Sequence, residues 1–228
     1  MIKTIVVDTL NGIQQDEWME MQKKAGHDEW LDFGKDIYTF VLALQKRGFE
    51  IVEIPGYEGS GKSYGMKGLK AGTNIWFNCD KKNPTWEGGR EEYGTKANPT
   101  KYHILPNGYD AIIKHIDATI AGGFLDKNPI AFLTCHIEDF KSGTETRQRM
   151  KTLGKVATKM NIEGKMENVF YSKIVREGNA TKYYLATKNN GFNTGRSSEG
   201  MFKEELIPNN FQLIVDALDK LNGVTPQK

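Results

Sequence analysis

The sequence predicts an α/β fold with a mainly parallel sheet. Short apolar segments rich in β-branched residues alternate along the chain with segments of helical periodicity. Three of the apolar segments run directly into a polar residue, at Asp8, Asp80 and His136. A length of 228 residues fits one domain, so we expect residues 1–228 to fold together.

The expected elements follow from periodicity and from turn residues. The expected strands cover residues 2–7, 51–54, 74–79 and 130–135. The expected helices cover residues 14–25, 28–47, 62–69, 108–120 and 209–222. Residues 166–176 and 181–187 alternate around a Glu-Gly-Asn turn and predict a C-terminal β-hairpin. The polar segments 81–108 and 141–151 predict a long surface excursion and a mobile loop.

Composition excludes several classes of protein. The chain carries 31 Lys and Arg against 29 Asp and Glu, so its net charge of +2 predicts no strong overall attraction to nucleic acid or membrane. No apolar run approaches the roughly 18 residues of a membrane helix, and the N-terminus opens into a strand rather than a signal peptide. Cys79 and Cys135 form no CxxC pair, which predicts reduced thiols and a cytoplasmic location.

Residues 56–63 carry the strongest functional signal, a complete GxxxxGKS motif between a strand and a helix. In such a loop the glycines let backbone N–H groups converge on phosphate oxygens, and the helix that follows adds its positive end. Lys62 is expected to reach the β and γ phosphates, and Ser63 to ligate Mg²⁺. The alternative is a glycine-rich turn of similar sequence. The candidate nucleotide-binding residues are Gly56, Tyr57, Glu58, Gly59, Ser60, Gly61, Lys62, Ser63 and Tyr64.

Polar residues at the strand ends could complete this site, because ligands of open α/β sheets bind beyond the carboxyl ends of the strands. Asp8 is the candidate carboxylate for Mg²⁺, acting through water. Asp80 could polarise the attacking water as a general base, and His136 could sense the γ-phosphate. The alternatives are a helix cap for Asp8 and solvated loop residues for the other two. The four histidines lack metal-ligand spacing, so zinc is not indicated.

Residues 141–165 are rich in Lys and Arg within a nearly neutral chain. A basic segment of this kind is a candidate nucleic-acid contact, although a solvated surface is the commoner explanation of a charge run. The candidate DNA-binding residues are Arg147, Arg149, Lys151 and Lys155.

Five stretches of the chain together resemble bacteriophage ATP-binding proteins of the RecA-like class, a family associated with recombination and single-strand annealing. They are residues 6–13, 56–65, 76–82, 134–139 and 193–198. The resemblance implies a three-layer P-loop NTPase core, ATP with Mg²⁺, a homo-oligomer and single-stranded DNA as partner. It implies Walker A roles for Lys62 and Ser63, a Walker B role for Asp8 and catalytic roles for Asp80 and His136. It also suggests that Arg196 completes a neighbouring subunit's site.

The order of the blocks departs from that family. Here the Walker B unit, residues 1–50, precedes the Walker A unit, residues 51–130, while residues 131–228 hold the sensor strand, basic loop, hairpin and final helix. We therefore expect permuted connectivity, of natural or engineered origin, with each strand–helix unit intact.

The expected function is ATP binding and hydrolysis in phage DNA recombination or strand annealing, in the host cytoplasm. Two alternatives stay open at this point. One is a P-loop kinase acting on a nucleotide or small molecule, with Arg147 and Arg149 on a lid. The other is a nucleotide-dependent DNA-binding module that does not hydrolyse ATP.

Overall fold

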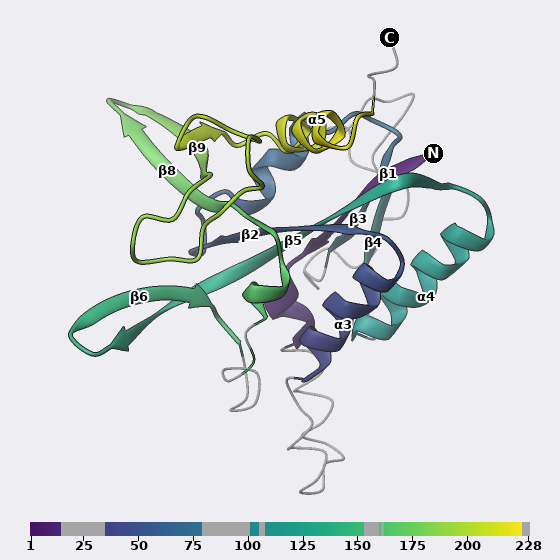
Figure 1. Cartoon of the computed structure of the whole chain (residues 1–228), viewed down its shortest axis with the longest axis horizontal. Helices are drawn as coiled ribbons and strands as arrows, with labels where there is room; N and C mark the ends of the chain where they lie inside the picture. The colour runs from purple at the N-terminus through teal and green to yellow at the C-terminus, as the bar shows by residue number, and fades with distance from the viewer. Residues whose placement is uncertain (15–34, 79–100, 105–107, 153–159, 161, 225–228) are drawn as a thin grey trace, which may run out of the picture.

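The computed structural model describes residues 1–14, 35–78, 101–104, 108–152, 160 and 162–224. Its centre is a parallel sheet with the strand order β4-β3-β1-β5-β2-β7, to which β6 adds antiparallel beside β5 (Figure 1). The strands are β1 (Ile2–Asp8), β2 (Glu50–Gly56), β3 (Asn74–Asn78), β4 (Lys101–Ile104), β5 (Leu125–Ser142), β6 (Glu145–Met150) and β7 (Asn168–Val169). The predicted α/β class with a mainly parallel sheet is confirmed.

Helices cover both faces of this sheet. Alternate residues of a strand point to opposite faces, so Ile5 and Val7 of β1 enter one core cluster and Val6 enters the other. The first cluster includes residues of α3 (Lys35–Lys46) and α4 (Gly108–Ala121), which lie on one side of the sheet in Figure 1. The second includes residues of the 3₁₀ helix η1 (Lys62–Gly68) and of α5 (Phe211–Leu221). This layering is compatible with a three-layer α/β fold.

The predicted helices agree with these elements where the structure describes them. In α3, Ile37, Val41 and Leu44 are buried on one face, as their spacing predicts. The final helix α5 is capped by Asn210, whose side chain accepts a hydrogen bond from the Gln212 N–H at 2.9 Å. The predicted helix at 14–25 and the start of the one at 28–47 lie outside the described residues.

A small antiparallel sheet of β8 (Tyr171–Glu177), β9 (Ala180–Ala186) and β10 (Leu206–Pro208) packs beside β2. Its β8–β9 pair is the predicted C-terminal hairpin. Glu177 pairs with Ala180, so the turn is Gly178-Asn179, with Gly178 at φ 60°.

The prediction of a loop at residues 141–151 was wrong. β5 does not end near Cys135 but continues to Ser142, turns at Gly143 and pairs back through β6 up to Met150. We call residues 137–150 the arm. Few of its residues are apolar, because the arm projects from the sheet and its strands are held mainly by backbone pairing (Figure 1). Low apolar content alone therefore did not distinguish this hairpin from a loop.

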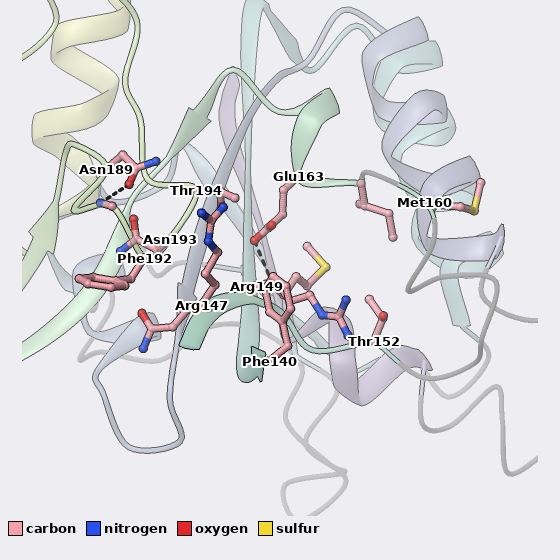
Figure 2. A pocket seen from close by; sticks show the side chains of 14 residues that line it. Phe140, Arg147, Arg149, Thr152, Met160, Glu163, Asn189, Phe192, Asn193 and Thr194 are labelled. Atoms are coloured by element: carbon pink, nitrogen blue, oxygen red, sulfur yellow. Dashed lines mark hydrogen bonds between the residues drawn. The ribbon is translucent and has the colours of Figure 1, made fainter. Parts of the chain in front are cut away.

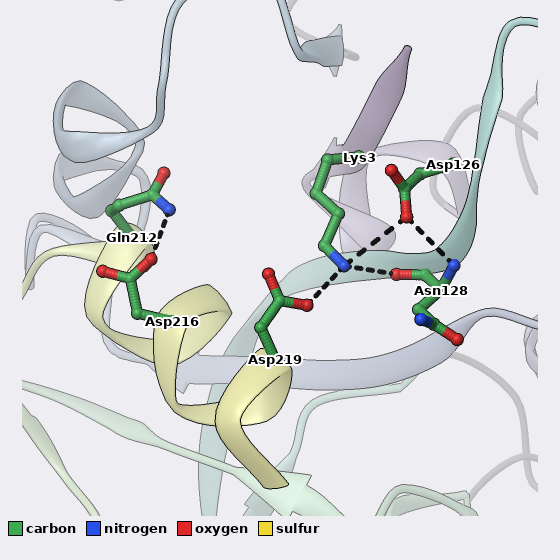
Figure 3. Close-up of polar contacts among 6 residues, drawn as sticks. All are labelled: Lys3, Asp126, Asn128, Gln212, Asp216 and Asp219. Atoms are coloured by element: carbon green, nitrogen blue, oxygen red, sulfur yellow. Dashed lines mark hydrogen bonds and ion pairs between the residues drawn. The ribbon is translucent and has the colours of Figure 1, made fainter. Parts of the chain in front are cut away.

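At the opposite end of the sheet, polar contacts tie β1 to β5 and α5 (Figure 3). The Lys3 ammonium donates to an Asp219 carboxylate oxygen at 2.6 Å and to the Asn128 carbonyl at 2.8 Å. Asp126 lies 3.7 Å from the same ammonium. β1 is thus held beside the start of β5.

None of the described helices is long and apolar enough to span a membrane.

Candidate functional site

The glycine-rich loop leaves the carboxyl end of β2 at Gly56 and enters η1 at Lys62. Gly59 and Gly61 have φ values of 72° and 82°, in the left-handed region that favours glycine. A Cβ on Gly61 would lie 2.3 Å from Cδ1 of Tyr183, so this position has no room for a side chain. The loop is anchored from β8, where the Ser172 hydroxyl donates to the Ser60 carbonyl at 2.6 Å.

The Lys62 ammonium lies inside this loop. It donates to the Tyr57 carbonyl at 2.8 Å and lies 3.2 Å from Nδ1 of His136. Burial lowers the pKa of Lys62, while nearby acidic groups, Asp8 among them, oppose that shift. A cation held at this point by a loop carbonyl is placed to meet a phosphate group entering the loop.

Asp8 and Ser63 meet at the carboxyl ends of the strands. The Ser63 hydroxyl donates to one carboxylate oxygen of Asp8 at 2.7 Å, and the Thr134 hydroxyl donates to the other at 2.6 Å. The contact is set by strand order, because β5 lies between β1 and β2 and presents Thr134 to Asp8. A hydroxyl and a carboxylate are hard oxygen ligands of the kind that Mg²⁺ prefers, so these residues fit the ion. The described residues contain no group of three or more His, Cys, Asp or Glu suited to a metal by themselves.

His136 lies where β5 leaves the sheet and not, as expected, at a strand end. It is the last residue that β5 pairs with β2, opposite Gly56. Its backbone N–H donates to the Asn11 side-chain oxygen at 2.5 Å. Burial and then the Lys62 charge lower the pKa of His136, which favours a neutral imidazole with Nδ1 accepting from the ammonium.

Tyr57 links the loop to the arm. Its hydroxyl donates to Asp139 at 2.6 Å and accepts from the Gln148 side-chain amide at 2.9 Å. Asp139 and Gln148 are cross-strand partners in β5 and β6, so both project from the same face of the arm. Sequence reasoning placed Tyr57 in the loop but did not anticipate these partners, and it assigned no role to Thr134 or Asn11.

Two buried acids, Glu53 and Glu163, interact electrostatically, and sequence reasoning did not anticipate them. Glu53 of β2 is fully buried, and one of its oxygens accepts from the Cys135 thiol at 3.0 Å. Burial raises the pKa of Glu53, and the negative charge of Glu163 raises it further. A Glu between Val52 and Ile54 is the only sequence signal for this feature. Cys135 is a free thiol, as predicted, and Cys79 lies outside the described residues.

The basic candidates lie on the arm, directly after it, or outside the described residues. Arg147 and Arg149 lie on β6 and pair with acids of the arm, at 3.0 Å to Glu145 and 2.8 Å to Glu138. Lys151 directly follows β6, and its backbone N–H donates to the His136 carbonyl at 2.8 Å. Asp80 and Lys155 are outside the described residues.

Arg196 makes its contacts within its own chain. Its guanidinium donates to the carbonyls of Met166, at 2.6 and 3.1 Å, and of Thr194, at 3.0 Å. Its backbone forms a bridge with Val169 at the edge of the central sheet. Its trans-acting role stays a prediction.

No protein-family model matches the chain, and comparisons with curated proteins and with solved structures give no match either. The functional argument therefore depends on the geometry of the loop and of the strand ends around it.

Proposed function

We propose that this protein binds ATP with Mg²⁺ at residues 56–63 and hydrolyses it. The observation that carries the proposal is the 2.7 Å hydrogen bond from Ser63 to Asp8, beside the buried Lys62 ammonium. These residues come from two distant places in the sequence, Asp8 from the end of β1 and Lys62 with Ser63 from the GxxxxGKS motif. They nevertheless form one cluster of the residue types that phosphate and Mg²⁺ need. A glycine-rich turn without a ligand would not require a lysine buried among polar groups.

The order of strands supports a RecA-like arrangement reached through exchanged blocks. The exchange predicts that the Walker B strand and the phosphate-loop strand both lie beside the strand that carries His136. In the sheet, β5 is flanked by β1 on one side and β2 on the other. The connectivity can therefore change while Asp8, Ser63 and His136 keep a common edge.

The chemistry would be positioning and charge stabilisation. Lys62 would leave the Tyr57 carbonyl and contact the β and γ phosphates. Ser63 and Asp8 would hold Mg²⁺, which supplies further neutralisation of phosphate charge when bound. A water oxygen attacks the γ-phosphorus, the bond to the ADP oxygen breaks, and the water's proton passes to a base, for which Asp80 is the candidate. His136, neutral beside Lys62, would contact the γ-phosphate.

We also propose single-stranded DNA as partner, within a homo-oligomer that acts in phage recombination or strand annealing in the host cytoplasm. Lys151 directly follows β6, and Arg147 and Arg149 alternate along that strand and so share a face of the arm. Their acidic partners are about one-third to one-half exposed, and such surface pairs contribute only about 0–1 kcal/mol, which lets a phosphate replace them.

The deciding experiment compares wild type, Lys62→Ala and Lys67→Ala for ATP binding and for ATP hydrolysis with and without single-stranded DNA. Lys67 lies in the same 3₁₀ helix but is exposed, so its variant controls for loss of a positive charge. We expect ATP binding and turnover to disappear only in Lys62→Ala and turnover to rise with DNA. Phosphoryl transfer to a nucleoside or metabolite without DNA stimulation would instead identify a kinase. ATP binding without turnover would identify the non-hydrolysing module, and equal behaviour of both variants would refute the site.

A further inference from the structure

A pocket of about 410 Å³ lies between the arm and the loop that joins β9 to β10 (Figure 2). Its size falls within the usual range for small-ligand sites. The residues that line it include Phe140, Arg147, Gln148 and Arg149 of the arm and Phe192 and Asn193 of the loop. No residue of the phosphate loop lines it in the described part of the chain.

The pocket presents aromatic surface to solvent. The Phe192 side chain is 52% exposed although it sits in a polar loop between Gly191 and Asn193. Across the pocket, the Arg149 guanidinium lies 4.6 Å from the centre of the Phe140 ring. An exposed ring such as that of Phe192, with arginines in the same pocket, is the usual kind of platform on which the bases of nucleic acids stack.

A buried hydrogen-bond donor in the wall lacks a partner. Asn193 is 6% exposed, and its side-chain oxygen accepts from the Gly195 N–H at 3.0 Å. Its Nδ2 has no hydrogen-bond partner among the described residues. A buried donor left unpaired is unfavourable, so an acceptor supplied by a ligand would satisfy it. Nucleobases carry such acceptors as ring nitrogens and carbonyl oxygens.

The charges at the rim favour an anion. Arg147 and Arg149 line the pocket, and their ion pairs with Glu145 and Glu138 lie at the surface. The acid in the wall, Glu163, is 8% exposed and accepts the Met150 backbone N–H at 3.0 Å, so it is engaged by the protein. A phosphate could therefore bind at the arginines while the base lies deeper in the pocket.

We infer that this pocket binds one nucleotide, with its base against Phe192, an acceptor of the base at Asn193 Nδ2 and its phosphate at Arg147 and Arg149. The nucleotide could be free or one unit of a single strand, since both offer the same groups. The inference deepens the proposed contact of single-stranded DNA with Arg147 and Arg149 and rests on that part of the proposed function. It does not depend on the proposed ATP site, because the pocket and that site share no residue.

The test uses the full chain and two probes, fluorescein-labelled (dT)₁₅ followed by anisotropy and dTMP followed by calorimetry. Phe192→Ser removes the exposed ring. Asn193→Asp keeps the oxygen that accepts from Gly195 and removes the Nδ2 donor. Phe124→Ser is the matched control, because Phe124 is also exposed, at 65%, and lies just before β5. Melting temperatures check that each variant is folded.

We expect Phe192→Ser to weaken binding about ten-fold and Asn193→Asp about five-fold, with Phe124→Ser unchanged. Binding of both probes supports a site for a free nucleotide, and binding of (dT)₁₅ alone supports a strand. The inference is overturned if wild type binds neither probe, if both pocket variants bind like wild type, or if only Lys62→Ala loses binding. If Lys62→Ala still binds ATP while Phe192→Ser loses (dT)₁₅, the proposed ATP site fails and the pocket stands.

Discussion

The Tyr57 hydroxyl, in the phosphate loop, donates a 2.6 Å hydrogen bond to the Asp139 carboxylate on the arm. Gln148, opposite Asp139, donates to the same hydroxyl, and its backbone N–H donates to the Phe192 carbonyl at 2.7 Å. A short chain of hydrogen bonds therefore connects the glycine-rich loop, residues 56–63, with the pocket beside Phe192. Because the Lys62 ammonium donates to the Tyr57 carbonyl, we expect that a ligand which draws Lys62 away would also disturb this connection.

Asp139→Ala should loosen the arm. The substitution removes the acceptor of the Tyr57 hydroxyl, a contact near the surface whose loss costs about 1 kcal/mol. We expect faster amide hydrogen exchange in residues 56–63 and 137–150, measured by mass spectrometry. Asp216→Ala, which removes an exposed acceptor on α5, is the control. Unchanged hydrogen exchange in residues 56–63 would show that the hydrogen bond between Tyr57 and Asp139 does not stabilise that loop.

Asp8→Asn should make ATP binding less dependent on Mg²⁺. The amide keeps the shape of the side chain and can accept from Ser63 or Thr134, but it lacks the negative charge that the ion requires. We expect affinity for ATP to fall about ten-fold in Mg²⁺, consistent with the loss of one charged contact, and to stay near wild type in EDTA. Asp110→Asn, in exposed α4 surface, should match wild type in both buffers. An equal loss in EDTA would argue against a metal role.

Glu53→Gln should stabilise the fold at alkaline pH more than at acidic pH. Burial and Glu163 raise the folded pKa of Glu53, while contacts with Cys135 and Arg196 only partly oppose them. Because the pKa is raised in the folded state, the contribution of Glu53 to the free energy of unfolding is fully present below the unfolded pKa of about 4.3. It is lost as the pH rises through the folded pKa, by about 1.4 kcal/mol per pH unit. Gln carries no such dependence.

The check is urea unfolding at pH 4.5 and pH 8, with Glu199→Gln as the exposed control. The free energy of unfolding of Glu53→Gln relative to wild type should be higher at pH 8. A difference that does not change with pH would mean that Glu53 is ionised in the folded chain.

Alanine substitutions should separate the two left-handed glycines of the phosphate loop. Gly59→Ala meets nothing within 4 Å, so its cost is the backbone strain alone, about 1–2 kcal/mol. Gly61→Ala adds a collision with Tyr183, whose ring stacks on Tyr64 at 4.6 Å and cannot move freely. We expect a further loss of about 1–3 kcal/mol in urea unfolding. Equal losses would mean that the Tyr183 ring moves aside without cost.

The features that the sequence by itself determined are those encoded by neighbours along the chain. The glycine-rich turn between β2 and η1 needs only residues 56–63 in order, and the β8–β9 hairpin needs only alternation around Gly178. The buried face of α5 follows in the same way from the spacing of Phe211, Ile214, Val215 and Leu218. These patterns depend on local backbone geometry, which any strand order would preserve.

Only the tertiary structure decided which distant residues meet. Asp8 reaches Ser63 because β5 lies between β1 and β2, and strand order leaves no trace in the periodicity of a sequence. The burial of Glu53 and the hydrogen bond from Tyr57 to Asp139 likewise depend on which strands are neighbours in the sheet. The prediction of a loop failed at the arm because β5 and β6 are held there by backbone hydrogen bonds to each other. The composition of a polar segment does not reveal whether such a pairing strand is present.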